Sequence, residues 1–444
     1  MKDALARYFD LAGRGTSLRT EVVAGLTTFL TMAYIIFVQP QVLGAAGMDP
    51  GSVMAATCIA AAAGSLIMGI LANYPIGVAP GMGENFFFTY TVVIAMGIAW
   101  EKALAIVFIS GVVFILLTLF RIREMVINAV PECLKQGIAV GIGLFIAFIG
   151  LSEAGLVVAN PGGLLKMGAL HEGPVILAVF GIFVTAVLVA RGVKGAIILG
   201  MIATAIVGMA TGMLKYGGLI SAPPSIAPTF LRMDLAGALH WRYAVPIAIF
   251  LYMALFDTIG TLIGVASQAG MMKDGRMPRA SRALMADATA TTIGAALGTS
   301  TTLAYVESIA GVKAGGRTGI TAIVVGLLFL AALFFFPLVR TISGGIALPG
   351  GAILHPVTAP ALVIVGSMMM WGVKNIRWED YSDAIPAFLT IVAMPFTFSI
   401  AQGIAIGFVS YPIIKLSSGK GREVSPLTYI LGLLFILKFV FLEN

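Results

Sequence analysis

The chain has 444 residues, of which 59% are hydrophobic and only 11% are charged. Soluble domains carry roughly 25% charged residues, so the composition excludes a soluble fold. The net charge of +7 is typical of Lys and Arg kept in cytoplasmic loops, and we exclude nucleic acid as a partner. Because a membrane-spanning helix needs about 20 apolar residues, the composition predicts an all-α polytopic membrane protein.

Several functional classes are set aside because their motifs are missing. Residues 1–20 contain no short apolar segment with a cleavage site, so we expect no signal peptide. The segment Gly419-Lys420-Gly421 lacks the flanking residues of a nucleotide-binding loop, which argues against ATP-driven pumping. The histidines are isolated and the two cysteines lie in or beside apolar runs, so we expect no metal, cofactor or disulfide. Gradient-driven transport, without enzymatic chemistry, is the class that remains.

Apolar runs between polar breaks predict the spans in chain order. The first half contains runs at 22–39, 53–71, 76–96 (interrupted), 103–120, 134–151, 175–189 and 196–214. A polar, Pro-rich link at 215–242 follows. The second half contains runs at 244–266, 283–297, 299–312 (interrupted), 320–339, 356–371 and 384–414. The last of these is too long for one straight span and is divided at Pro395.

Basic residues orient these spans. With the N-terminus in the cytoplasm, the loops expected inside carry Arg121, Arg123, Arg191, Lys194, Lys273, Arg276, Arg279, Arg282, Lys313, Arg317, Lys374 and Arg377, as the positive-inside rule requires. Keeping Lys415 inside as well requires two crossings within 384–414, which makes about 14 spans. We interpret the run at 427–441 as an accessory or interfacial helix, with a fifteenth span as the alternative.

The two halves resemble one another at an offset near half the chain. Residues 29–33 (FLTMA) match 250–254 (FLYMA), 221 positions later, and Glu84 precedes Glu307 by 223 positions. Seven spans per half is odd, so the sequence predicts two inverted repeats. Short segments interrupt spans 3 and 10. The residues predicted to form the broken-helix backbone in these segments are Pro80, Gly81, Gly83, Thr301 and Thr302. Paired breaks of this kind mark a binding site at the membrane midplane, although Pro and Gly can also merely kink a packing helix.

Few ionisable side chains fall inside the predicted spans. A charge at the membrane centre costs at least roughly 2.5 kcal/mol, so Glu84, Asp257 and Glu307 are predicted to bind substrate and to exchange the coupling proton. We expect Asp287 to form an ion pair or a helix cap with the basic loop that contains Arg279 and Arg282.

The remaining side chains indicate the kind of ligand. We identify no Arg or Lys at the depth of the breaks, which disfavours an anionic substrate. Carboxylates beside Asn85 suit a neutral ligand rich in N–H donors, and one of the rings that begin at Phe86 could face a planar ligand. Alternatives stay open: a neutral acid bonded to a backbone break, or aromatic rings that only pack.

The motifs in these segments resemble those of the nucleobase and ascorbate transporter superfamily, and within it the azaguanine-resistance type of hypoxanthine, guanine and adenine permeases. The matching segments are 25–34 (GLTTFLTMAY), 79–83 (APGMG), 255–261 (LFDTIGT) and 305–308 (YVES) with Gly311. The resemblance implies fourteen spans in two inverted repeats, with a substrate-carrying core (20–124 and 243–340), a gate (125–215 and 350–444) and a linker (216–242). It also implies a homodimer formed through the gate.

By this resemblance, Asp257 and Glu307 correspond to the substrate and proton acids, Asn85 corresponds to a third-span contact, and Ser308 joins the substrate site. Two positions depart from the family pattern, because Glu84 stands where Leu is common and Ala254 where a second acid is common. We hypothesise that the site carboxylate has moved from one element to the other. Gln39 also replaces the usual Asn before Pro40, a change that the sequence does not explain.

Together these features predict a plasma-membrane importer of purine nucleobases by proton symport. A uracil or xanthine transporter of the same superfamily is the near alternative, and an anion transporter of the sulfate-permease type is a more distant one. A channel or a membrane scaffold without transport activity would belong to a different class. Three acids at the site disfavour an anion carrier, and a scaffold would not need paired broken helices.

Overall fold

The computed structural model describes residues 2–120, 130–160, 162–272, 277–348 and 351–441. Of the basic loop residues named above, Arg121, Arg123, Lys273 and Arg276 lie outside these ranges. Within them, eight helices are long and apolar enough to cross a membrane, and three shorter apolar helices accompany them. The protein is therefore a mostly helical, multi-pass membrane protein, as its composition predicts.

The helices follow the predicted apolar runs closely. In the first half they are α1 (Lys2–Phe9), α2 (Leu18–Met32), α3 (Ile35–Gly44), α4 (Pro50–Ile67), η1 (Met68–Ala72), α5 (Met82–Phe86), η2 (Phe87–Ala95), α6 (Trp100–Leu119), α8 (Glu132–Glu153), α9 (Gly173–Ala190) and α10 (Ala196–Ala210). In the second half they are α11 (Leu235–Ala238), η3 (Trp241–Tyr243), α12 (Ala244–Gln268), α13 (Ala280–Leu297), α14 (Ser308–Lys313), α15 (Gly319–Ala332), η4 (Leu333–Phe335), α16 (Phe336–Ser343), α17 (Ala359–Met369), η5 (Met370–Asn375), α18 (Tyr381–Phe396), α19 (Ile400–Ser417), η6 (Gly421–Glu423) and α20 (Pro426–Phe441).

Local chemistry explains several helix ends. Asp49 caps α4 by accepting a hydrogen bond from the amide of Ser52, and Pro50 fits the first helical turn because its missing N–H would be unpaired there. Ser399 caps α19 in the same way. The predicted division of 384–414 is confirmed, since α18 ends just beyond Pro395 and α19 begins at Ile400.

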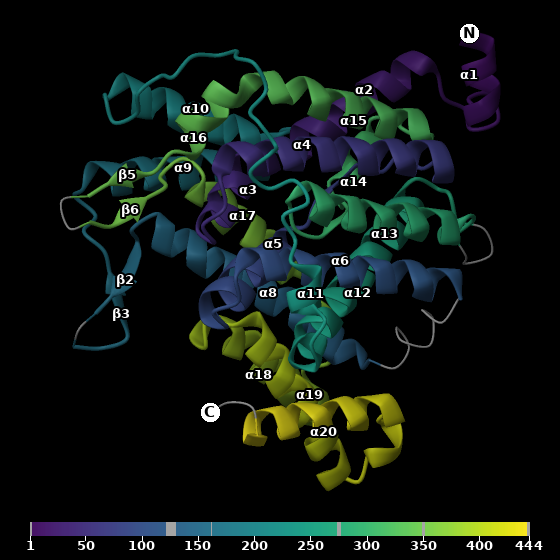
Figure 1. The fold of residues 1–444 in the computed structure, drawn as a ribbon, viewed down its shortest axis with the longest axis vertical. Coiled ribbons are helices and arrows are strands. Elements are labelled where there is room, and N and C mark those ends of the chain that lie inside the picture. The colour runs from purple at the N-terminus through teal and green to yellow at the C-terminus, as the bar shows by residue number, and fades with distance from the viewer. Residues whose placement is uncertain (1, 121–129, 161, 273–276, 349–350, 442–444) are drawn as a thin grey trace.

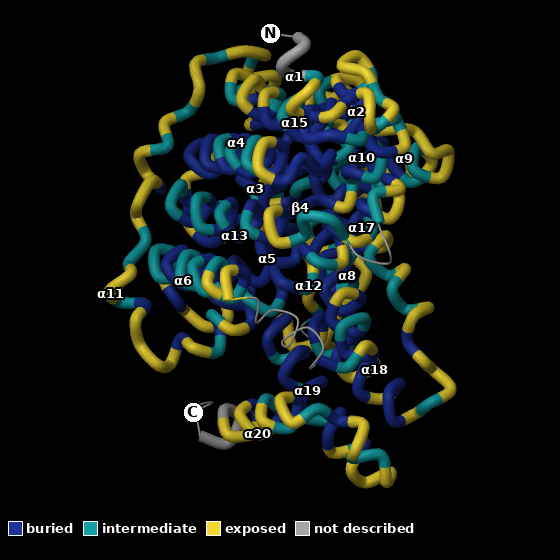
Figure 2. Tube along the Cα trace, turned by 90° about the vertical axis from the view of Figure 1, so that its right-hand side faces the viewer, coloured by how far each residue is buried: buried dark blue, intermediate teal, exposed yellow. Residues whose placement is uncertain are grey.

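The long helices form two packing groups. In the first helix group, α6 packs on α13 and α15 on α4, while α12 contacts α6 and α2 contacts α15. In the second helix group, α8 packs on α17 and α18, α9 on α10 and α17, and α19 on α18. Figure 1 shows α18, α19 and α20 together at one end of the long axis, opposite α1. Buried residues fill the inner helices, whereas the linker around α11 and one face of α20 are exposed (Figure 2).

In the described ranges, six short strands accompany the helices. The strands β2 (Val157–Ala159) and β3 (Leu165–Met167) form one hairpin, and β5 (Ile346–Ala347) and β6 (Ile353–Leu354) form another. The third pair is not local, because β1 (Val78–Pro80) pairs antiparallel with β4 (Thr302–Ala304). Ala79 lies opposite Leu303, 224 positions later in the chain. This pair joins the two segments that the sequence identifies as interruptions.

Candidate functional site

The β1–β4 pair forms the buried backbone frame of the site. The amide of Gly81 donates to the carbonyl oxygen of Thr301 at 2.9 Å, and the Tyr305 hydroxyl donates to that of Pro80 at 2.5 Å. A Cβ on Gly81 would lie 2.4 Å from Glu84 Oε2 and 2.8 Å from Leu303 Cδ2, so a larger residue here would displace these two side chains. Hydrogen bonds between the strands replace those that helices would supply at this position.

The predicted break residues are distributed unevenly around this frame. Pro80 and Thr302 lie in the strands, and Gly81 and Thr301 adjoin them. Gly83 is different, because α5 begins at Met82 and already includes it. The expectation that Gly83 belongs to non-helical backbone is therefore wrong: the chain regains helical geometry immediately after Gly81.

A buried polar network lies beside the strands. The Ser300 hydroxyl donates to Asn85 Oδ1, and Gln39 Nε2 donates to Thr299 Oγ1 at 3.0 Å and to Ser300 Oγ at 3.3 Å. Gln39, which the sequence could not explain, therefore links α3 to the turn before β4. Asn85 Nδ2 has no hydrogen-bond partner among the described residues, but Asn85, which follows Glu84 in the chain, is fully buried and does not line the cavity that adjoins this frame.

A cavity of about 560 Å³ adjoins this frame between α5, α8 and α12. It is lined by Gly83, Glu84, Glu132, Lys135, Gln136, Ile138, Ala139, Ile142, Tyr252, Met253, Phe256, Asp257, Ile259, Gly260, Thr261, Ile263, Val306 and Met369. We call it the acid cavity, because Glu84 and Asp257 both line it. The Glu132 side chain is 64% exposed, so the cavity reaches the protein surface at the start of α8. Its volume falls in the range of small-molecule sites.

The two acids of this cavity differ in their surroundings. Glu84 is 1% exposed, and its Oε2 has no partner among the residues that the structure describes. Asp257, by contrast, is exposed and lines the same cavity. An unpaired buried acceptor costs about 1–3 kcal/mol, so the arrangement is suited to a ligand or proton that pairs with Glu84.

Glu307 lies behind the acid cavity rather than on it. It immediately precedes α14, and its Oε1 accepts a hydrogen bond from the Tyr34 hydroxyl at 2.9 Å. Its neighbour Val306 lines the cavity. Ser308, also predicted to bind substrate, is fully buried, and its hydroxyl oxygen accepts from the amide of Gly77 at 3.0 Å. The structure thus brings Glu84 and Asp257 together and leaves Glu307 and Ser308 on the adjoining frame.

Phe86 points away from the acid cavity. Its ring stacks on Tyr90 at 5.5 Å, and the next ring, Phe87, packs edge-on against Phe250 at 4.7 Å. Residues two apart on a helix face nearly opposite directions, so Glu84 and Phe86 cannot share one face. In the described part of the chain, the aromatic side chains on the cavity are Phe256 and Tyr252.

The structure adds a cation that the sequence interpretation missed. Lys135 lines the acid cavity, with Nζ 3.3 Å from Glu132 Oε2 and 5.4 Å from the centre of the Phe256 ring. Lys135 lies in the first turn of α8, at the end where the cavity reaches the surface, so it adds a cation at the mouth of the cavity that the sequence interpretation did not consider. Lys135 falls within the predicted span 134–151, but only the packing of α8 against α12 brings it to Phe256.

Asp287 also differs from its expectation. Its side chain is fully buried, and its carboxylate accepts hydrogen bonds from the Ala304 amide at 2.6 Å and the Thr258 hydroxyl at 2.5 Å. The expectation that Asp287 forms an ion pair or a helix cap with the basic loop is therefore wrong. The carboxylate holds β4 against α12, since an unpaired strand amide at this depth would be costly.

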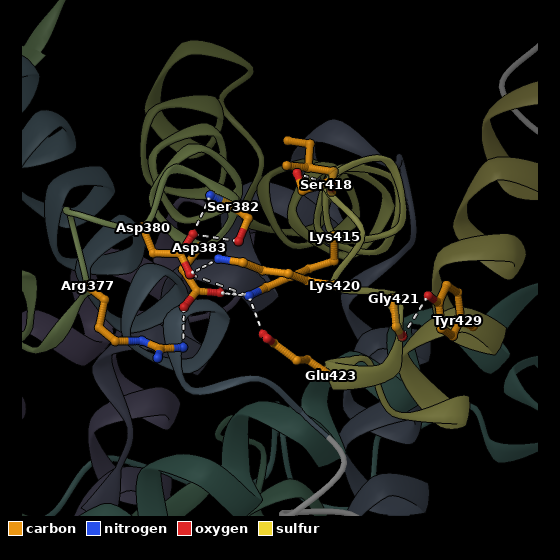
Figure 3. Close-up of polar contacts among 11 residues, drawn as sticks. Arg377, Asp380, Ser382, Asp383, Lys415, Ser418, Lys420, Gly421, Glu423 and Tyr429 are labelled. Atoms are coloured by element: carbon orange, nitrogen blue, oxygen red, sulfur yellow. Dashed lines mark hydrogen bonds and ion pairs between the residues drawn. The ribbon is translucent and has the colours of Figure 1, made fainter.

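A second cluster of charges lies at the α18–α19 end of the molecule (Figure 3). Lys415 of α19 is fully buried, with Nζ 2.9 Å from Asp383 Oδ1 and 2.7 Å from Glu423 Oε2. Arg377 pairs with the other oxygen of Asp383, and Lys420 with Asp380. The sequence interpretation used Lys415 only to orient spans and did not anticipate its buried partners.

Comparison with known proteins agrees with the sequence motifs. The model of the permease family matches residues 19–406. A putative permease of Methanocaldococcus jannaschii is 52% identical over 440 residues, covering 99% of this chain and 98% of that protein. The guanine/hypoxanthine permease PbuG of Bacillus subtilis is 47% identical over 448 residues, covering 98% and 99%. The adenine permease AdeP of Escherichia coli is 44% identical over 440 residues, covering 99% and 96%.

A solved structure shares the fold at low sequence identity. The transmembrane domain of the cyanobacterial bicarbonate transporter BicA superposes with a TM-score of 0.64 at 14% identity, over 86% of this chain and 97% of that one. Likeness at this identity concerns the fold alone. The relatives are permeases and not enzymes. The chain therefore belongs to the permease family, within the nucleobase and ascorbate transporters that its motifs predict.

Proposed function

We propose that the protein is a secondary active transporter that imports purine nucleobases (hypoxanthine, guanine or adenine) by proton symport. The acid cavity carries this proposal. Purines are planar and present several N–H donors, which Glu84 and Asp257 can accept, while Phe256 offers a ring face. Relatives named as adenine and guanine/hypoxanthine permeases support this substrate class.

Proton coupling follows from the placement of the three acids. A buried carboxylate is costly while charged and unpaired, and a base and a proton compete when they pair with the same carboxylate. Pairing of the base with one acid and protonation of a neighbouring acid together remove the buried charge. Glu307 accepts its hydrogen bond from Tyr34 on the frame that carries Val306 to the cavity. We assign the coupling proton to this group of acids and give Glu307 the role of its holder during the cycle.

The same proposal includes the repeat architecture. Helix pairs in the two halves pack in corresponding ways. The packing of α6 against α13 corresponds to that of α15 against α4, and the packing of α12 against α6 corresponds to that of α2 against α15. With the offset of 224 positions across β1–β4, this supports two inverted repeats of seven spans. The first helix group then belongs to the substrate-carrying core (20–124 and 243–340), the second to the gate (125–215 and 350–444), and 216–242 links them.

Placement in the cell completes the proposal. We propose a plasma-membrane protein with a cytoplasmic N-terminus, because the basic loops described above then lie inside. A homodimer would form through the gate, with lipid around it. For α20, its packing on α19 and its apolar sequence support an accessory membrane helix, and a fifteenth span remains the alternative.

Uptake by the purified protein in liposomes tests the function. Radiolabelled adenine, guanine, hypoxanthine, xanthine, uracil and bicarbonate are offered with and without an inward proton gradient. We expect accumulation of at least one of the first three bases, driven by the gradient and lost in Asp257→Asn. Uptake confined to xanthine or uracil would move the protein to a different branch, and uptake of bicarbonate alone would contradict the proposal.

A further inference from the structure

Two cavities lie at opposite ends of α8. The acid cavity reaches the surface at Glu132, the first residue of this helix. A second cavity, of about 870 Å³, includes Glu153, the last residue, and reaches the surface at Ile353, which is 60% exposed. Because α8 has 22 residues, these ends are about 33 Å apart. The two cavities therefore approach the molecule from opposite ends of the same helix.

A cluster of aromatic side chains packs on α8 between its two ends, at Phe145 and Phe148. We define the aromatic plug as Phe86, Tyr90, Phe145, Phe148 and Phe398. Tyr90 of η2 stacks on Phe86 and meets Phe145 of α8 at 6.4 Å and Phe398 at 5.7 Å. Phe398, which stands between α18 and α19, also packs against Phe145 at 5.4 Å. The plug thus joins the element that follows Glu84 to helices of the second group.

Glu153 connects the plug to the second cavity through two hydrogen bonds. Its Oε1 accepts from the Tyr90 hydroxyl at 3.1 Å, and its Oε2 accepts from Gln41 Nε2. Gln41 belongs to α3, which packs on α4, while η2 contacts α3 and α6. Both hydrogen bonds therefore cross from the first helix group to the second.

We propose that Glu153, Tyr90 and Gln41 form a latch that closes the acid cavity from the second cavity, and that it opens during transport. The inference rests on the proposed function, because alternating access requires one helix group to move against the other around the site. In the present conformation the acid cavity opens at the Glu132 end and the latch closes the Glu153 end. Opening requires the Gln41 and Tyr90 hydrogen bonds to break together.

Unpaired polar atoms lie beside the latch and could serve as alternative partners when its hydrogen bonds break. Gln41 Oε1 and His355 Nδ1 are buried without a hydrogen-bond partner among the described residues, and both side chains line the second cavity with Glu153. The His355 amide donates to the carbonyl oxygen of Glu153 at 2.9 Å. A purely structural contact would leave fewer unpaired polar atoms, whereas a latch needs alternative partners when it opens.

Cysteine labelling from outside the cell tests the latch. In a background without Cys58 and Cys133, Ala139→Cys places a reporter on the acid cavity, and a membrane-impermeant thiol reagent is added to intact cells. Under the proposed orientation the Glu153 end faces outward. We expect slow labelling with the latch intact. Labelling should be about fivefold faster in Tyr90→Phe, which loses one hydrogen bond, and about thirtyfold faster in Glu153→Ala, which loses both.

A matched control removes an equivalent hydroxyl elsewhere. The Tyr429 hydroxyl donates to the Gly421 carbonyl oxygen at 3.1 Å, far from the latch in sequence and between elements at the C-terminal end. Tyr429→Phe should leave the labelling rate unchanged. Glu153→Leu, which is similar in size and cannot accept either hydrogen bond, serves if Glu153→Ala does not elute as a folded protein. Unchanged labelling in folded Glu153 and Tyr90 variants, or an equal increase in Tyr429→Phe, would overturn the latch.

Cross-linking provides the converse measurement. Gln41→Cys with Glu153→Cys, bridged by a reducible bifunctional thiol reagent, should stop base uptake and release it on reduction. Sustained uptake by the bridged protein would show that these residues need not separate. A protein that transports no purine would refute the proposed function, yet the labelling rates would still decide whether the latch exists.

Discussion

Glu84 is costly to bury without a partner, but its position makes it available to a ligand. Its carboxylate is buried, and one oxygen lacks a partner, yet it faces the same cavity as Asp257. Ala254, one helical turn before Asp257, is 2% exposed and packs in an apolar cluster. The hypothesis that a carboxylate has moved from position 254 to position 84 therefore has a testable consequence.

We expect Glu84→Leu to lower kcat/KM for purine uptake about tenfold to a hundredfold, because a charged hydrogen bond contributes about 1.5–3 kcal/mol. Adding Ala254→Asp should recover part of this loss. Residues that act as one unit show coupling of about 0.5–3 kcal/mol in a double-mutant cycle. Losses that simply add across the single and double variants would show that the two positions are independent.

His355 predicts a pH effect at the second cavity. Burial lowers the pKa of its imidazole to about 4, below the unperturbed value of about 6.5. The unfolded chain binds the proton first, so stability falls as the pH drops from about 6.5 to 4, by up to about 3 kcal/mol. The thermal unfolding temperature of His355→Gln in detergent should fall less than that of the wild type as the pH drops across this interval. The exposed His171→Gln is the control, and parallel profiles for all three proteins would contradict the expectation.

Sequence predicts individual residues best where the signal is local. Glu84, Asp257 and Glu307 stand out because each is an acid in an apolar run, and the first two meet on one cavity. Lys135 and Phe256 give no such signal, because their roles depend on how α8 packs against α12. The prediction that the Phe86 ring faces the ligand is wrong for a similar reason, since the direction of this ring depends on where α5 begins.

At the scale of elements, the ion cluster of Figure 3 fixes the end of the α18–α19 hairpin. Asp380 caps α18 by accepting from the Ser382 amide. Hydrogen bonds from Lys420 and then Ser382 hold the pKa of Asp380 below its usual range. Its contribution to stability is therefore present above about pH 3.9 and is lost as the pH falls further.

Lys415→Ala tests this cluster. It would leave Asp383, which is 2% exposed, without its buried cation, and breaking a buried pair costs about 3–5 kcal/mol. We expect a clear loss of thermal stability in detergent. Lys420→Ala, in which the lost cation is 41% exposed, should cost no more than about 1 kcal/mol. Equal losses in the two variants would show that burial does not distinguish them.

Element boundaries were predictable where proline or glycine marks them. Pro395 predicts the division between α18 and α19, and Pro80 with Gly81 predicts the interruption before α5. The division between α2 and α3 falls at Ala33 and Tyr34, where no such residue stands, and the sequence missed it. The pairing of β1 with β4 was also missed, because a strand of three residues leaves no periodic pattern.

At the scale of the whole molecule, the two helix groups meet along α8, with a cavity at each end of that helix. Ala79 and Leu303, which face one another, are 224 positions apart, close to the offsets of 221 and 223 between the similar segments. Sequence could not anticipate which end would be open, because that depends on contacts between the groups, such as those of Glu153. In the proposed transport cycle, these contacts alternate while the acids bind substrate and proton.

The proton gradient across a reconstituted membrane gives the most direct test of this account. Accumulation of the transported purine is measured in liposomes containing wild type or Glu307→Gln, with exchange of labelled for unlabelled base as the control for folding and binding. We predict gradient-driven accumulation by wild type, and exchange without accumulation by Glu307→Gln. Normal gradient-driven accumulation by Glu307→Gln would contradict the account, because the acid beside Tyr34 would then have no part in proton coupling.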